Sequence, residues 1–368
     1  MTTPDWRDGK RYLWPLGLLV PLIPFGAWLG VHLTGLSLFW WSGPILVFVV
    51  FPLVDTIVGQ DTENPPEAAI PGLEADRYYR WCTYLYLPVQ YVSLVFAGWL
   101  WTRPELGTVD RVGLAVSVGC VSGIAINTAH ELGHKREDLE RWLSRIALAQ
   151  TGYGHFYVEH NRGHHVRVAT PEDPASSRLG ESFWAFLPRS VAGSARSAWK
   201  LEFARLRRGG GNPWTWRNDV LTSWAMTLVL FAALAVAFGP AILPYLLIQA
   251  VFGFSLLEVV NYLEHYGLSR QREHTGRYEK VRPSHSWNSN QVPSNLLLFH
   301  LQRHSDHHTY PTRRYQSLRH FEEAPQLPSG YPLMIILAWV TPLWRRVMDP
   351  RVLAHYDGDL SRTNRGPQ

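Results

Sequence analysis

The stretch LQRHSDHH, at residues 301–308, is the one around which the chain is organised. Histidines at positions i, i+3 and i+4 of an α-helix fall within about 100° of arc, so their imidazoles can converge on one point. Imidazole binds iron, copper and zinc, and it is the commonest metal ligand in proteins. The stretch therefore predicts a metal site on one face of a helix.

Two further histidine boxes and one isolated histidine precede this stretch. They are HELGH at 130–134, EHNRGHH at 159–165, and the histidine of NYLEHYG at 261–267. Sixteen histidines occur in the chain, and their concentration in these boxes favours ligands over scattered structural residues. The candidates are too many for one ion and suit two: His130, His134, His160, His164, His165, His265, His304, His307 and His308.

The second box carries a geometric constraint. On an ideal helix His164 lies about 40° from His160, whereas His165 lies about 140° away. His164 and His165 therefore cannot easily serve the same ion. Either they divide between two metals, or the helix unwinds there, which Gly163 would permit.

Polar residues near the boxes are candidates for supporting roles. Carboxylates that hydrogen-bond to histidine ligands compensate the charge of a metal. Those next to a ligand in sequence are Glu131, Glu159, Glu264 and Asp306. Three polar residues fall inside apolar segments near the boxes, where they are costly and indicate either function or an interhelical hydrogen bond: Asn127, Glu258 and Asn261. His155, His285 and His300 could support ligands without binding metal themselves.

Long apolar segments separate the boxes. The chain has 368 residues, 46% hydrophobic and 13% aromatic. Segments of about 19 to 22 residues are long enough to cross a bilayer. An all-α membrane protein with six transmembrane helices is expected, at about 12–33, 36–56, 81–101, 109–129, 220–238 and 240–262. A run at 331–344 is too short to span and should lie in the interface or pack on the base of the bundle.

Charge and topology agree on orientation. The net charge is +5, and most lysine and arginine follows even-numbered segments, which places those loops in the cytoplasm. Every histidine box also follows an even-numbered segment, so all candidates emerge on one side. We expect one inner-membrane domain over 1–368, with cytoplasmic catalytic segments at 130–219 and 263–356. Residues 357–368 are expected to form a flexible tail or linker.

The ligand types narrow the metal and the class of site. An all-imidazole set excludes calcium and magnesium, and nine ligands exceed a tetrahedral zinc site. Two irons fit best, with copper second. Cys82 and Cys120 form no CxxC pair, so a thiolate site or disulfide framework is not expected. No nucleic-acid module or Ser/His/Asp arrangement is present. A metal transporter or store would place histidines along a path through the membrane, not on one face.

Several motifs resemble one known family. HELGHK at 130–135, EHNRGHH, NYLEHYGL at 261–268 and LQRHSDHH look like the boxes of the integral-membrane non-haem diiron alkane 1-monooxygenases. TPEDPASSRLGESFW at 170–184 and RRYQSLR at 313–319 are also similar to that family. The resemblance implies terminal hydroxylation of medium- or long-chain n-alkanes with O2 at two iron ions held by the nine histidines. Xylene-type side-chain monooxygenases and fatty-acyl desaturases share much of this pattern and are the alternatives.

The resemblance also implies an electron donor, rubredoxin, which is reduced by an NAD(P)H-dependent reductase. The paired CxxC motifs of a rubredoxin are missing from this sequence, so we expect a separate protein or a domain fused beyond the C-terminal residues. Rubredoxins are typically acidic, and a basic face near the boxes is a plausible docking surface. The candidates for docking are Lys135, Arg136 and Arg303.

Overall fold

The structure, a computed structural model, describes residues 6–366. Over that range its named elements are all helical, and only isolated β-bridges occur besides them. Five helices in these residues are long and apolar enough to cross a membrane. They are Arg11–Thr34, Ser37–Val58, Thr108–Gly133, Asp219–Phe238 and Pro240–His265. The expected all-α membrane fold is therefore confirmed.

The first two spans form a hairpin with irregular helices. Residues Arg11–Leu22 form a 3-10 helix because Pro15 and Pro21 lack the amide protons of a regular α-helix, and α1 (Ile23–Thr34) follows. The turn between the spans has Gly35 at φ 71°, a conformation that glycine adopts without strain. The second span consists of η2 (Ser37–Trp41), α2 (Ser42–Ile45), a π turn at Leu46–Val50, and α3 (Phe51–Val58).

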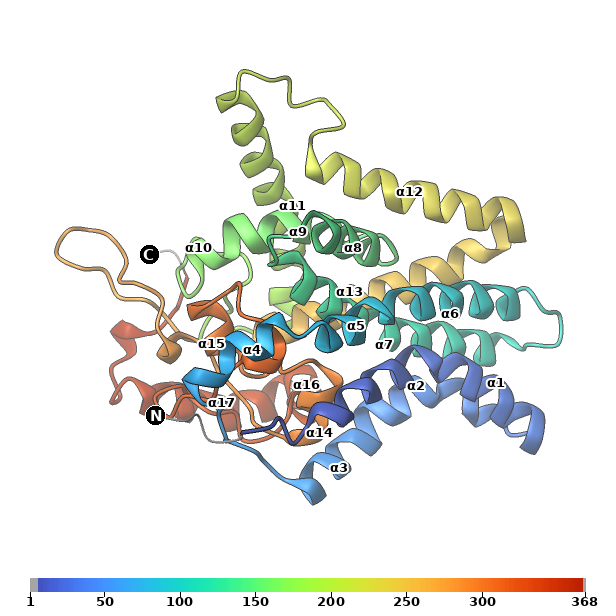
Figure 1. Cartoon of the computed structure of the whole chain (residues 1–368), viewed down its shortest axis with the longest axis horizontal. Helices are drawn as coiled ribbons and strands as arrows, with labels where there is room; N and C mark the ends of the chain where they lie inside the picture. The colour runs from blue at the N-terminus through green and yellow to red at the C-terminus, as the bar shows by residue number, and fades with distance from the viewer. Residues whose placement is uncertain (1–5, 367–368) are drawn as a thin grey trace.

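The span expected at 81–101 is not one continuous helix. It divides into α5 (Arg77–Tyr84) and α6 (Tyr86–Trp101), which meet at Leu85. Pro88 has no amide proton to donate to the carbonyl of Tyr84, so the α-helical ladder breaks here. Six uninterrupted spans were expected, and the third of them is instead two helices. Of these two, α6 still runs beside α7 (Figure 1).

The helix α7 (Thr108–Gly133) lies at the centre of the bundle, and 83% of its most apolar stretch is buried. It packs closely on α13 (Leu243–His265) because glycines occupy their interface. A Cβ on Gly119 would lie 2.8 Å from the Cβ of Phe252, and one on Gly123 would lie 2.9 Å from Leu256. Small residues that let backbones approach are typical of membrane-helix interfaces. This contact sets the two histidine-bearing helix ends side by side.

Further helices, most of them short, form a cap at one end of the spans (Figure 1). Some of them follow α7, and the rest follow α13, except for α4, which precedes α5. The bounds are α4 Ile70–Ala75, α8 Asp138–Ala149, α9 Phe156–Glu159, α10 His165–Arg167, α11 Phe183–Arg208, α14 Val292–Leu297, α15 His304–Thr309, α16 Tyr331–Trp339 and α17 Thr341–His355. The remaining span is α12 (Asp219–Phe238), which α13 follows through a 3-10 turn at Pro240–Ile242.

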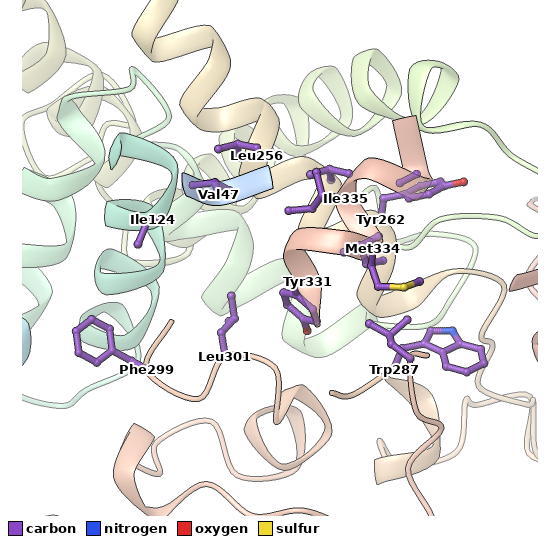
Figure 2. Packing of buried hydrophobic residues seen from close by; sticks show 14 of the residues in the cluster. Val47, Ile124, Leu256, Tyr262, Trp287, Phe299, Leu301, Tyr331, Met334 and Ile335 are labelled. Carbon is purple, nitrogen blue, oxygen red and sulfur yellow. The ribbon is translucent and has the colours of Figure 1, made fainter. Parts of the chain in front are cut away.

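A large apolar core joins the cap to the spans. It includes Val47 from the second span, Leu256 from α13 and Ile335 from α16, which Figure 2 shows close to one another. The helix α16 packs on α13, so the short run at 331–344 packs on the bundle. This is one of the two placements expected for it, the other being the membrane interface.

Residues 357–366 adjoin the cap, and backbone hydrogen bonds join them to it, which corrects the expectation of a flexible tail for this part of the chain. Asn364 is buried, and its backbone N–H donates to the carbonyl of Gly267 at 3.0 Å. The amide of Leu179 donates to the carbonyl of Asn364 at 2.7 Å. The backbone of this segment is therefore paired with the cap, a contact that polar composition does not reveal. Residues 367 and 368 lie outside the described range.

Candidate metal centre

Four segments bring the histidine boxes to one place. The C-terminal end of α7 supplies His130 and His134, and the end of α13 supplies His265. The second box follows α9, and the last box is on α15. The nine histidines form two groups, and within each group every histidine has a ligand atom within 4.8 Å of those of the other members. The first group contains His130, His134, His160, His165 and His307, and the second contains His164, His265, His304 and His308.

The Nε2 atoms point into the two groups. In the first, His165 Nε2 lies 3.1 Å from His160 Nε2 and 3.1 Å from His307 Nε2. In the second, His308 Nε2 lies 2.8 Å from His304 Nε2 and 3.2 Å from His164 Nε2. Nitrogens that converge in this way are arranged to share an ion. The groups adjoin, since the rings of His165 and His308 are 4.3 Å apart between centroids.

A π turn divides the second box between the groups. Residues His160–His164 form it, and the amide of His165 donates to the carbonyl of His160. This i to i+5 bond brings His165 beside His160, whereas an ideal α-helix would bring His164 there. His164 and His165 therefore fall in different groups, one of the two outcomes expected. A Cβ on Gly163 would lie 2.6 Å from Glu159 Oε2 and 2.6 Å from Arg167 Nη2, so a side chain at this turn would displace that ion pair.

Asp173 fixes the orientation of one imidazole. Its Oδ2 lies 2.8 Å from His164 Nδ1, and both side chains are buried. When Nδ1 of His164 carries the proton and donates it to this carboxylate, Nε2 is unprotonated and presents its lone pair to the other nitrogens of the second group. Burial acts to raise the pKa of Asp173, but the hydrogen bonds that its carboxylate accepts from His164 and Ser176 act against burial, and the pKa of Asp173 is lowered. Asp173 is therefore ionised.

Burial favours the neutral form of six of these imidazoles. It lowers the pKa of His134, His160 and His165 well below the ordinary value, and the charges of neighbouring histidines add to the effect. The same causes lower the pKa of the three histidines on α15. Neutral imidazole is the form that binds metal. Nε2 of His130 and of His134 is buried and has no hydrogen-bond partner among the described residues, a costly state that a metal ion would relieve.

An apolar pocket of about 810 Å³, its open mouth included, leads to both groups. Its wall contains His130 and His160 from the first group and His304 from the second. Most of the remaining wall is aliphatic and comes from the second span and from α7, α13, α14 and α16. Two of the predicted intramembrane polar residues, Asn127 and Asn261, also line it. The pocket suits an apolar molecule that reaches the histidines end-on.

Comparison with known proteins agrees with this geometry. Residues 111–338 match the model of the fatty acid desaturase family. The alkane 1-monooxygenase of Acinetobacter baylyi is 46% identical over 98% of this chain and 89% of its own length. Alkane 1-monooxygenase 1 of Alcanivorax borkumensis is 48% identical over 96% of this chain and 88% of its own. The chain belongs to the alkane 1-monooxygenase family. The xylene/toluene monooxygenase hydroxylase component of Pseudomonas putida is more distant, at 29% identity over 74% of each chain.

In this member of the alkane 1-monooxygenase family, the four predicted carboxylates differ in position. Glu264 contacts a histidine of the site, since its Oε2 lies 3.2 Å from His304 Nε2 and its Oε1 accepts from the hydroxyl of Tyr331 at 2.7 Å. The other three pair with basic side chains: Glu131 with Lys135 at 2.9 Å, Glu159 with Arg167 at 2.6 Å, and Asp306 with Arg313 at 2.8 Å. These three hold the helix ends that carry the histidines.

Two of the three polar residues predicted inside the spans have hydrogen-bond partners in this family member. Glu258 accepts from the hydroxyl of Tyr153 at 2.6 Å, and Asn127 donates to the carbonyl of Leu298. His155, His285 and His300 lie outside the two groups. His300 Nδ1 contacts the carbonyl of Tyr315 at 2.9 Å, and His285 Nδ1 accepts from the amide of Arg282 at 3.0 Å.

The docking prediction is wrong for two of its three residues. Lys135 is buried, and its Nζ donates to the carbonyl of Arg313 at 2.7 Å as well as to Glu131. Arg303 is also buried, and its two terminal guanidinium nitrogens donate to three backbone carbonyls inside the cap. A surface partner cannot reach either charge. Arg136 is exposed and remains a candidate.

Proposed function

We propose that this chain is an alkane 1-monooxygenase that hydroxylates the terminal carbon of medium- and long-chain n-alkanes with O2. The nine histidines of the two groups would hold two iron ions, one in each group. The all-imidazole donor set suits iron and excludes calcium and magnesium. Bound in reduced form, two irons would supply the activation of O2 that an unreactive C–H bond requires.

The apolar pocket is the observation that carries this proposal. Its wall reaches a histidine of each group, so a hydrocarbon chain that fills it would place one end beside the metal centre. The aliphatic side chains of the wall exclude water and bind the chain without directional contacts. Tyr331, whose hydroxyl donates to Glu264, lies in the same wall and holds that carboxylate against His304.

The proposal includes the electron supply and the location. Rubredoxin, as a separate protein or a fused domain, would deliver electrons from an NAD(P)H-dependent reductase. The histidine cap would face the cytoplasm from the inner membrane. The excess of lysine and arginine after even-numbered spans supports this orientation. An alkane dissolved in the bilayer could then reach the pocket from between the helices.

Product analysis tests the reaction. Purified chain supplied with iron, rubredoxin, its reductase, NADH and O2 is expected to convert n-octane to 1-octanol. Parallel reactions with p-xylene and with an acyl thioester test the two alternative activities. An alkene from the acyl donor, or a benzylic alcohol formed faster than 1-octanol, would contradict the proposal.

Asp173 is expected to act as a positioning residue. The substitution Asp173→Asn removes the charge that holds the proton on His164 Nδ1. Loss of such a partner typically lowers metal affinity or activity by about 10- to 100-fold. We expect a loss in this range in turnover, together with an altered iron absorption or Mössbauer spectrum. The control is Glu172→Gln, an exposed neighbour whose contacts are with Arg272 and Tyr278, and it should leave both readouts unchanged.

A further inference from the structure

The helix α11 carries three distinct faces. One face, with Phe183, Phe186, Ser190, Ser194 and Ala198, is buried against the protein. A second face carries apolar side chains near the surface, of which Trp184 is 58% exposed. A third face carries exposed basic residues at Arg196, Lys200 and Arg207. Apolar and basic stripes side by side are typical of a helix that lies in a membrane interface.

The position of α11 fits such an interface. It projects from the body across the direction of the spans, and a loop joins it to α12 (Figure 1). The loop ends at Asn218, which caps α12 by accepting from the amide of Val220 at 3.0 Å. Because α12 enters the membrane directly after the loop, the α11–α12 corner (residues 196–218) lies at the level of the lipid headgroups.

Tryptophans mark this level. Trp214 and Trp216 of the loop are 66% and 78% exposed. The ring of Trp199 on α11 lies 5.0 Å from that of Trp214 and stacks on Trp224, in the first turns of α12, at 6.4 Å. Tryptophan is enriched at membrane–water interfaces, where its ring is apolar and its N–H reaches water. An exposed cluster of this kind would be unfavourable in water alone.

Most basic side chains of the corner have no carboxylate within it that is free to neutralise them. Its acidic residue, Glu202, is already paired with Arg162 and Arg205. The next carboxylate, Asp219, is paired with Arg145 and Arg162. Among the described residues, Arg207, Arg208 and Arg217 have no ion pair, and Arg207 and Arg217 lie over the rings of Phe203 and Trp216. Exposed cations above an aromatic layer match the phosphate groups of lipids.

We propose that the α11–α12 corner binds the headgroups of anionic phospholipids. The tryptophans enter the interface, and the three arginines contact the phosphates. The corner also connects to the histidine site. Arg167 donates to Ser197 of α11 at 2.7 Å, and Arg162 pairs with Glu202, so α11 supports the segment that contains His160, His164 and His165.

Lipid titration tests this proposal. The full-length protein in detergent is titrated with phosphatidylglycerol or phosphatidylcholine while the thermal unfolding midpoint is followed. Phosphatidylglycerol should raise the midpoint at lower concentration than phosphatidylcholine. In the variant Arg207→Gln/Arg208→Gln/Arg217→Gln, the phosphatidylglycerol concentration that gives half of the rise in the midpoint should increase by roughly five-fold per side chain at low salt. The charge-matched control Arg277→Gln/Lys280→Gln/Arg282→Gln, on an exposed loop of the cap, should behave as the unmodified protein.

The proposal would be overturned if the corner variant kept the phosphatidylglycerol effect or if the control lost as much of it. A nitroxide label gives an independent readout, since Cys82 and Cys120 are both buried and leave an introduced cysteine as the reactive one. In lipid nanodiscs, a label at Trp216→Cys should be more accessible to O2 than to a water-soluble nickel complex. A label at Arg277→Cys should be more accessible to the nickel complex than to O2. Equal, water-like accessibility at both positions would show that the corner is free for a soluble partner instead and contradict the proposal.

Discussion

The substitution His308→Ala is expected to lower alkane hydroxylation by more than about 100-fold, beyond the upper end of what losing an outer hydrogen-bond partner costs. His308 Nε2 lies 2.8 Å from His304 Nε2 and 3.2 Å from His164 Nε2, so its loss removes a ligand from the four-histidine group. The remaining three imidazoles would hold their ion weakly. Turnover of n-octane at saturating rubredoxin, measured as 1-octanol formed per chain, checks this expectation.

A histidine outside the two groups provides the control. His274 is exposed on the loop that follows α13, and His274→Ala should retain full activity and full iron content. The metal-site assignment would be refuted if His308→Ala retained more than a tenth of the turnover while folding normally. Folding is checked by the thermal midpoint, because the cap is built around these imidazoles and removal of one leaves a cavity.

The second large effect is expected from Ile335→Trp. Ile335 lines the pocket one helical turn beyond Tyr331, which holds Glu264 near the histidines, and it packs near Val47 and Leu256 (Figure 2). A tryptophan there would fill the part of the pocket away from the metal centre. Turnover of dodecane should fall by at least about ten-fold relative to that of hexane, since a pocket discriminates by 10-fold or more per missing or added methylene.

The conservative variant Ile335→Val tests whether volume is the cause. It should shift the preference little, or toward longer chains, because it removes a methylene group from the wall. Iron content should be unchanged, and the free energy of unfolding should fall by only about 0.5–1.5 kcal/mol, the usual cost of Ile→Val in a core. An unchanged hexane-to-dodecane ratio in the tryptophan variant would mean that the alkane does not occupy this pocket.

Local periodicity was sufficient to predict much of this molecule. The apolar segments exceed 18 residues, so bilayer length alone identifies them, and the i, i+3 and i+4 spacing of His304, His307 and His308 places them on one face. Because each box follows the cap-side end of a span, topology alone predicts that the nine imidazoles meet.

What sequence did not predict depends on departures from ideal helices and on tertiary contacts. The π turn at 160–164 exchanges the expected positions of His164 and His165 relative to His160, and a 3.6-residue period cannot show it. Pro88 was visible in the sequence as the signal that interrupts the span at 81–101. Asp173 lies nine residues after His164 and contacts it through the fold, so neighbourhood in sequence does not find it. The sequence signal that could have pointed to Asp173 is its position between Pro171 and Pro174, since prolines restrict the backbone and favour a rigid loop.

The buried cations show a further limit. Lys135 and Arg303 look like surface charges in the sequence, but both are buried in the cap, where backbone carbonyls and Glu131 accept hydrogen bonds from them. Burial of a hydrogen-bonded charge is decided by tertiary structure and has no periodic signature in the sequence.

The central claim, that the two histidine groups hold two iron ions, is tested most directly by counting metals in the purified full chain. Elemental analysis together with Mössbauer spectroscopy should give two irons per chain, both in nitrogen-rich, non-haem sites. One zinc ion per chain in a closed site, or a single iron that is unaffected by His308→Ala, would contradict the account.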